Sequence, residues 1–337
     1  MIINLLYLGD LVFSLPLLKA IKAARPETEL ILVANSNFIE LPRQLDFIDR
    51  TLSYNKSWPL NKSFSFAKKL RNLDIPLSLN IHGNWRTALL QRLIATDYRA
   101  GYNRSGQRYL YHYHKDWEPG NQHMVEYFLD WLKDLNIKKP ENIALPEVTY
   151  AELSPARKNE LGLNNKKYLI LNPGGSWPTK RWPVNKFTSL ADKLLTETDL
   201  DIVLTGGPGD LERNKQIMAQ ISTGQEKRLH NTAGRTSIPD LMAITAAAEF
   251  MVSGDTGPVH LAALFRTPAL TIFGPSAETM YRPYGQQEDY PIIANWGLHC
   301  RPCGEHECPL GHHKCLQDLT VKEVFRKIKE GFDERLF

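Results

Sequence analysis

The sequence lacks any long apolar run and carries little excess of charge of either sign. No stretch of its 337 residues approaches the roughly 20 apolar residues of a membrane span. The apolar start, residues 1–6, has no basic segment before it and is interrupted by Asp10, so we expect no signal peptide. The 41 basic and 37 acidic residues leave +4, too little to indicate nucleic acid as a partner. We therefore expect a cytoplasmic protein, at most peripheral to a membrane.

Cysteine is scarce and confined to one segment. The four cysteines form a Cys-x2-Cys-x4-Cys-x6-Cys array at Cys300, Cys303, Cys308 and Cys315. Four soft ligands at this spacing fit a structural, tetrahedral zinc site. Two disulfides, with three pairings, are the alternative, although cytoplasmic thiols are more often reduced or metal-bound.

No Gly-x-Gly-x-x-Gly follows an expected strand, which argues against a nicotinamide dehydrogenase. The length is comfortable for two domains, and 42% hydrophobic with 23% charged residues is typical of a globular protein. In both halves apolar runs alternate with segments of helical periodicity, which predicts parallel sheets with helices on their faces. We expect strands at 2–7, 30–34, 76–81, 168–172, 201–205, 249–252 and 269–273.

The polar, turn-rich residues 138–166 separate the two halves. We expect a first domain over residues 1–150 and a second over 151–320, with the Cys-rich segment 300–315 inside it and a C-terminal helix over 321–337. Four strands of the second half end in Gly, Pro or Ser turns. Ligands of open α/β sheets bind outside the carboxyl ends of strands, so these turns are the expected site.

One of these turns, residues 253–260, reads Ser-Gly-Asp-Thr-Gly-Pro-Val-His between an apolar strand and a helix. A helix that begins at Gly257 and Pro258 directs backbone N–H groups at whatever lies above the strand end, which suits a phosphate. Proline is also favoured in the first turn of any helix, so a well-formed strand–helix turn is the competing interpretation.

Three blocks together resemble glycosyltransferase family nine, the bacterial heptosyltransferases. They are residues 8–18 around Gly9 and Asp10, residues 173–183 from Pro173 to Pro183, and residues 255–263 continued by 272–276. The resemblance runs in order from Gly9 to Cys315, with a slightly shorter N-terminus than usual.

The resemblance implies an α/β GT-B fold, in which two Rossmann-like domains face each other across a cleft. It implies an N-terminal acceptor domain and a C-terminal nucleotide-sugar domain. The implied reaction is inverting, metal-independent transfer of heptose from ADP-heptose to lipid A bearing Kdo, or to a heptosylated inner core. No cofactor is then required for catalysis.

Such a transfer needs a base for the acceptor hydroxyl and positive charge beside the departing diphosphate. Asp10, just beyond the first strand, is the expected base, although a Gly-Asp pair is also an ordinary helix cap. Lys180, after a Gly-Gly-Ser loop, is the expected phosphate cation, together with the N–H groups of Thr256 and Gly257.

Other donor-binding roles follow from position along the chain. Gly175, Ser176 and Thr179 lie in the loop before Lys180, and either Asp210 or Glu212 is expected to hold the ribose. Met242 is expected near the adenine, with a core position as its alternative. Asp255 is expected to orient the turn or to accept a sugar hydroxyl. His260 is expected beside it, with a neutral structural role as the alternative.

The segment 86–115 is locally basic, with six Lys or Arg residues against one Asp. Arginine forks match the carboxylates and phosphates of the expected acceptor. A solvated surface is the competing explanation for each of them. The acceptor-binding prediction comprises His82, Arg86, Arg99 and Arg104.

The acidic pair Asp199 and Asp201 precedes its strand, so it would lie at the wrong edge of the sheet for a site. Two other functions remain open at this stage. One is a sugar-nucleotide epimerase of the same fold, which needs no acceptor, and the other is a non-catalytic sugar-nucleotide-binding protein.

Overall fold

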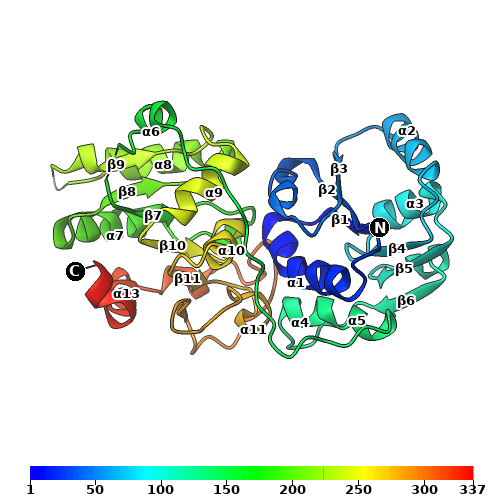
Figure 1. The fold of residues 1–337 in the computed structure, drawn as a ribbon. Helices are drawn as coiled ribbons and strands as arrows, with labels where there is room; N and C mark the ends of the chain where they lie inside the picture. Colours follow the sequence, from blue (N-terminus) through cyan, green and yellow to red (C-terminus); the bar gives the residue numbers. More distant parts are fainter. Residues whose placement is uncertain (165, 223, 337) are drawn as a thin grey trace. The chain divides into compact units, whose positions relative to one another are not determined.

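The computed structural model describes residues 1–164, 166–222 and 224–336. Contacts within the chain divide it into two compact units, Met1–Pro146 and Glu147–Phe337 (Figure 1). Each unit is built on one six-stranded sheet flanked by helices.

All strand pairs in unit 1 are parallel, and the strand order is β3-β2-β1-β4-β5-β6. The strands are β1 (Ile2–Asn4), β2 (Ile31–Asn35), β3 (Arg50–Tyr54), β4 (Leu77–Asn80), β5 (Tyr98–Asn103) and β6 (Tyr113–Asp116). The α-helices are α1 (Leu8–Ala24), α2 (Leu60–Arg71), α3 (Trp85–Ile94), α4 (Met124–Leu129) and α5 (Trp131–Asp134). Helix α1 packs against α4 and α5, whereas α2 packs against α3.

Unit 2 repeats this arrangement, with the strand order β12-β11-β10-β7-β8-β9 and parallel pairs throughout. The strands are β7 (Tyr168–Asn172), β8 (Asp201–Leu204), β9 (Leu229–Asn231), β10 (Phe250–Gly254), β11 (Ala269–Phe273) and β12 (Ile292–Ala294). The α-helices are α6 (Pro155–Leu161), α7 (Val184–Glu197), α8 (Leu211–Ala219), α9 (Ile238–Ala246), α10 (Gly257–Leu264), α11 (Glu278–Tyr281), α12 (Lys314–Gln317) and α13 (Val321–Leu336).

The predicted α/β class, with parallel sheets in both halves, is confirmed. Strands β7, β10 and β11 are buried at every position, which is why they read as continuous apolar runs in the sequence. The first strand is shorter than predicted, because the Asn4 side chain accepts a hydrogen bond from the Leu6 N–H and α1 already begins at Leu8.

Candidate functional site

The two sheets share one strand order, and each therefore has one topological switch point. It lies between β1 and β4 in unit 1 and between β7 and β10 in unit 2. Ligands of open α/β sheets bind outside the carboxyl ends of the strands at this point. Asp10 and His82 follow β1 and β4, and Lys180 and Asp255 follow β7 and β10. Each unit thus has a candidate site at its own switch point.

In unit 2, glycines allow the loop after β7 to approach the turn after β10 closely. A Cβ atom added at Gly254 would lie 2.8 Å from the carbonyl oxygen of Lys180, and one at Gly175 would lie 3.0 Å from Cγ2 of Thr256. The Nε of Arg181 donates to the carbonyl of Gly175 at 2.7 Å. The loop backbone is therefore held against the start of α10.

The carboxylate of Asp255 is buried between Lys180 and His260. The Nζ of Lys180 lies 2.7 Å from its Oδ2, and Nε2 of His260 lies 3.6 Å from its Oδ1. Burial alone raises the pKa of Asp255, but the charge of Lys180 and the contact with His260 outweigh it and hold that pKa below its usual range. Asp255 is thus an anion that holds Lys180 in place, a contact that neither of its two expected roles named.

The start of α10 offers backbone donors rather than the Thr256 hydroxyl. Thr256 is the N-cap residue, and its hydroxyl accepts a hydrogen bond from Nδ2 of Asn172 at 3.0 Å and lies 3.1 Å from Oγ of Ser253. The first N–H groups of a helix have no partner within the helix, and they carry partial positive charge. The hydroxyl therefore fixes the turn, and the N–H groups at Thr256 and Gly257 are the groups suited to an anion.

The two predicted hydroxyl donors of the loop differ in their surroundings. Ser176 is exposed. Thr179 is buried, and its hydroxyl donates to the carbonyl of Glu305 at 2.8 Å. The one hydroxyl proton of Thr179 is thus engaged within the protein, which does not support its predicted role on phosphate.

The Cys-rich segment braces the loop that carries Lys180. The Nε2–H of His313 donates to the carbonyl of Thr179 at 2.8 Å. The ring of Trp177 stacks on that of His306 with centroids 3.7 Å apart, and the Nζ of Lys180 lies 4.4 Å from the Trp177 ring centroid. The position of the lysine therefore depends on a segment more than 120 residues away in the sequence.

The four cysteines are free thiols and line a cavity of about 20 Å³. Within the part of the chain that the structure describes, no three His, Cys, Asp or Glu side chains are arranged to hold a metal ion. The N–H of His313 donates to Sγ of Cys308, which lowers the pKa of that thiol, whereas burial raises the pKa of Cys315 to about 11. None of the three possible disulfide pairings is present, and the structural zinc stays a prediction for metal analysis.

Of the two acidic candidates for the ribose, Asp210 is used by the fold. Its Oδ2 accepts from the N–H of Gly207 at 3.0 Å, and a Cβ atom at Gly174 would lie 2.5 Å from its carboxyl group. Glu212 is exposed at the start of α8, with Lys215 at 3.8 Å. The geometry favours Glu212 as the group that a ligand can reach.

Met242 lies in α9 and is only 1% exposed, so its side chain belongs to the core of unit 2. The expectation that it lines an adenine pocket is not supported, and the core alternative describes its position.

Two cations near the loop, Arg181 and Arg213, were not predicted as site residues. The pKa of Arg213, on α8, is lowered by burial and by the neighbouring charge of Arg181, and Asp210 offsets this only in part. The charge of Arg181 disfavours the charged form of Arg213, and a bound anion would offset this effect. Arg181 could have been found, because it follows Lys180 directly, but nothing in the sequence singles out Arg213.

In unit 1, Asp10 lies in the first turn of α1, and the N-cap of that helix is Tyr7. The helix-cap alternative for Asp10 is therefore wrong. Burial lowers the pKa of Lys56, and the charge of Asp10 opposes this shift. The Nζ of Lys56 also lies 4.7 Å from the ring centroid of Tyr7. Sequence reasoning missed Lys56, since it follows β3, a half-exposed strand that was not predicted.

His82 is a buried, neutral imidazole. Burial, with the charges of Lys56 and Arg104, lowers its pKa to about 3. Its Nε2 accepts from the amide of Asn84 at 2.9 Å, so the ring proton resides on Nδ1, which has no hydrogen-bond partner among the described residues. The guanidinium of Arg104 lies 3.9 Å from the ring centroid of Trp117 and reaches the carbonyl of His82. His82 and Arg104 are therefore brought together, as predicted.

The other two predicted arginines are used within unit 1. Arg86 donates to the carbonyls of Lys56 and Trp58 and thereby braces the loop after β3. Arg99 lies near the beginning of β5, away from the carboxyl edge, and donates to the carbonyl of Thr96 at 2.9 Å. The structure does not bring either guanidinium to the acceptor site as a free fork, which corrects the expectation for Arg86 and Arg99.

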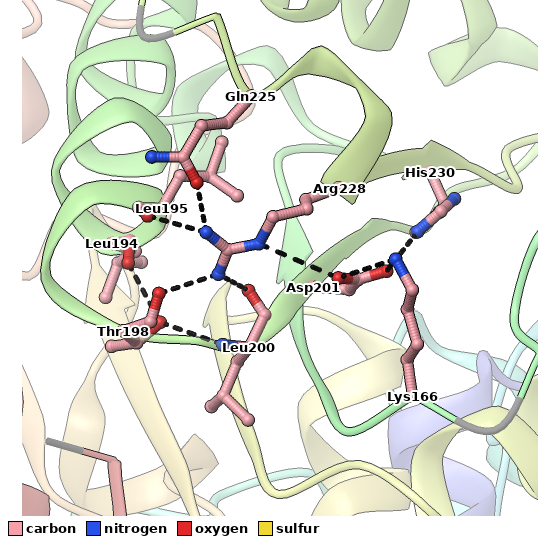
Figure 2. Close-up of polar contacts among 9 residues, drawn as sticks. All are labelled: Lys166, Leu194, Leu195, Thr198, Leu200, Asp201, Gln225, Arg228 and His230. Carbon is pink, nitrogen blue, oxygen red and sulfur yellow. Dashed lines mark hydrogen bonds and ion pairs between the residues drawn. The ribbon is translucent and has the colours of Figure 1, made fainter.

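The acidic residue at the start of β8 is structural, as expected. The Asp201 carboxylate lies 2.6 Å from His230, 3.2 Å from Lys166 and 3.7 Å from Arg228 (Figure 2). Arg228 in turn donates to three backbone carbonyls and to Gln225. The three guanidinium nitrogens of Arg228 are therefore all engaged at the amino end of β8.

No helix in the described ranges is both long enough and apolar enough to cross a membrane. The model of "Glycosyltransferase family 9 (heptosyltransferase)" matches residues 63–314. Lipooligosaccharide heptosyltransferase 2 of Campylobacter jejuni is 28% identical over 332 residues, with 96% of each chain covered. Lipopolysaccharide heptosyltransferase 2 of Salmonella typhimurium is 24% identical over 360 residues, with 97% of each chain covered.

Among solved structures, the E. coli ADP-heptose LPS heptosyltransferase II is similar with a TM-score of 0.82 and 21% identity, covering 98% of this chain and 97% of that one. An E. coli heptosyltransferase solved with ADP gives a TM-score of 0.73 and 22% identity, covering 98% of both chains. These likenesses establish the GT-B fold. Because the family model matches residues 63–314, most of the sequence, the chain belongs to glycosyltransferase family 9 and is a glycosyltransferase.

Proposed function

We propose that this glycosyltransferase transfers a heptose from ADP-heptose to the inner core of lipopolysaccharide, with inversion at the anomeric carbon and without a metal. Its relatives are heptosyltransferases by name, and the solved neighbours include one with ADP and one with an ADP-heptose analogue. The proposal depends chiefly on one observation: a carboxylate in unit 1 and a lysine in unit 2 each lie beside the switch point of their own sheet.

The donor is assigned to unit 2. The diphosphate would meet Lys180 and the N–H groups of Thr256 and Gly257, with Arg181 and Arg213 as further cations nearby. These groups supply the positive charge that the departing ADP needs, which supports transfer without a metal. Glu212 is assigned to the ribose hydroxyls.

The acceptor is assigned to unit 1, where Asp10 takes the proton of the attacking hydroxyl. The new glycosidic bond forms at the anomeric carbon as the bond to the diphosphate breaks, and ADP leaves with the electron pair. Lys56, Arg104 and the Nδ1–H of His82 are assigned to the anionic groups of a Kdo-bearing or heptosylated acceptor. An acceptor anchored by lipid A would place the enzyme at the cytoplasmic face of the inner membrane.

The test is a donor panel of ADP-, UDP- and GDP-sugars, measured first by thermal stabilisation and then by transfer to truncated lipopolysaccharide. We expect stabilisation and transfer with ADP-heptose, no requirement for metal after chelation, and an inverted anomeric product by NMR. The Asp10→Asn variant should bind ADP normally and lose transfer by at least about 100-fold. Conversion of the donor without acceptor, or full activity of a folded Asp10→Asn enzyme, would contradict the proposal.

A further inference from the structure

Two neighbouring helices of unit 1 expose large apolar side chains to solvent. Leu60 and Phe64 on α2 are 70% and 52% exposed, and Trp85 and Leu89 on α3 are 53% and 43% exposed. Each pair is spaced i, i+4, so both members lie on one line along their helix. Single exposed apolar residues are common on protein surfaces, but two such lines on adjacent helices form a patch.

The two helices lie side by side, as Figure 1 shows. At their C-terminal ends, Nε of Arg71 donates to the carbonyl of Leu93 at 2.6 Å. Both helices follow strands of one parallel sheet, so their N-terminal ends, which carry the apolar pairs, lie together at the carboxyl edge. Tyr109, 80% exposed, extends the patch, because the segment before it accepts a hydrogen bond from Trp85 Nε1 at Ser105.

The segment that contains α2, α3 and Tyr109 is strongly basic. Residues 55–115 hold 11 Lys or Arg and only two acidic residues, Asp74 and Asp97. Both lines of apolar residues continue into cations, Lys68 and Arg71 on α2 and Arg92 on α3. The exposed basic residues around the patch are Lys62, Lys68, Lys69, Arg71, Arg86, Arg92, Arg104 and Arg108. The patch is therefore apolar at one end and cationic around it.

The combination of exposed apolar side chains and surrounding cations indicates which kind of partner could cover the patch. A second copy of the chain would bring the same basic segment against itself, and the like charges would repel. A bilayer with anionic lipids attracts the cations and accepts Leu, Phe, Trp and Tyr at its interface. Charge complementarity thus favours an anionic membrane over a homodimer.

We propose that the exposed surface of α2 and α3, together with Tyr109, docks on an anionic lipid bilayer. We call it the α2–α3 face. This proposal rests on the proposed function, because a bilayer is the expected surface only if the acceptor is anchored by lipid. Helix α3 begins three residues after His82, so docking through its N-terminal end brings the bilayer surface to the acceptor site of unit 1.

The experiment is co-sedimentation of the full-length protein, without donor or acceptor, with vesicles of phosphatidylcholine alone or mixed with phosphatidylglycerol. We expect binding only to the mixed vesicles, weakened by salt. The double variants Leu60→Ser/Phe64→Ser and Lys68→Glu/Lys69→Glu should each lower the partition coefficient about tenfold or more, since one interfacial charge contributes a factor of about five. These side chains are exposed, so the fold should tolerate the changes.

Matched controls lie in unit 2. Leu310 is 62% exposed and Lys227 and Lys322 are exposed, so Leu310→Ser and Lys227→Glu/Lys322→Glu should bind vesicles as the wild type does. Equal binding by the test variants, or no binding by the wild type, would overturn the inference. Concentration-dependent dimerisation in sedimentation velocity that the apolar variant abolishes would also overturn it, in favour of a second copy.

Turnover separates this inference from the proposed function. With a delipidated, soluble acceptor, the variants of the α2–α3 face should keep wild-type kcat/KM. Vesicle binding without any transfer would reject the proposed function alone, and transfer without vesicle binding would reject the docking surface alone.

Discussion

Replacing Lys180 by methionine tests the centre of the donor site, because it removes the charge and keeps most of the side-chain volume. In the structure the lysine Nζ lies 2.7 Å from Asp255 Oδ2, with side chains 15% and 4% exposed. Without it, the partner that remains beside the buried carboxylate among the described residues is His260, at 3.6 Å. Breaking a fully buried pair costs about 3–5 kcal/mol. Since Lys180 is partly exposed and His260 remains, we expect the free energy of unfolding to fall by about 2 kcal/mol.

The effect on ADP binding should be larger than the loss of one contact. A hydrogen bond from a charged group contributes about 1.5–3 kcal/mol, which corresponds to about 10- to 150-fold in Kd. In the variant, the unpaired Asp255 anion also repels the diphosphate. The double variant Lys180→Met/Asp255→Asn should therefore bind ADP more tightly than Lys180→Met alone, although more weakly than the wild type.

Isothermal titration calorimetry with ADP and chemical denaturation measure these two effects separately. Lys193 provides a control, because its pair with Glu197 at 2.8 Å is exposed. Lys193→Met should change the stability by less than about 0.5 kcal/mol and leave the Kd for ADP unaltered. A folded Lys180→Met protein with the wild-type Kd would refute the assignment of Lys180 to the diphosphate.

Three further predictions concern positions that the structure makes specific. The pKa of His82 is lowered to about 3, so His82 stays neutral in the folded state at pH values where it takes up a proton in the unfolded state. The stability of the wild type should therefore fall as the pH drops from about 6.5 toward 3. A His82→Gln variant should show a shallower fall in thermal melts across that range. His313 has φ 47° and donates from Nε2 to the Thr179 carbonyl, so His313→Gln, whose amide reaches as far, should retain the donor KM. His313→Asn tolerates this backbone but is too short, and it should raise the donor KM severalfold while the acceptor KM stays constant. Equal behaviour of the two variants would count against positioning of the loop through that bond. Gly254→Ala places a Cβ atom 2.8 Å from a backbone oxygen and should destabilise the protein by about 1–3 kcal/mol, measured by urea denaturation against Gly209→Ala, where an added Cβ meets nothing within 4 Å.

The sequence by itself determined the class of the fold and indicated the principal candidate residues of the site. Buried parallel strands are apolar throughout and end in Gly or Pro turns, so β7, β10 and β11 could be located with little error. Asp10, Lys180 and Asp255 could be found because each directly follows such a strand or its loop. Local composition is sufficient for these features, since a strand and the turn after it are neighbours in the chain.

Tertiary structure decided what the polar side chains do. Strands β3 and β6 are half-exposed edge strands with polar residues, and their apolar pattern is too weak to predict them. Because β3 was not predicted, Lys56, which follows it, was not recognised as a candidate site residue. Arg86 was predicted to bind the acceptor, but its guanidinium donates to two carbonyls of the loop after β3.

The support of Lys180 shows the same limit in unit 2. His313 reaches the Thr179 carbonyl across 134 residues of sequence, and Asp255 reaches Lys180 across 75. A hydrogen-bonding group in a sequence indicates only what it can donate or accept. Which partner it finds depends on how the strands are ordered in the sheet, and that order arises from packing between segments far apart in the chain.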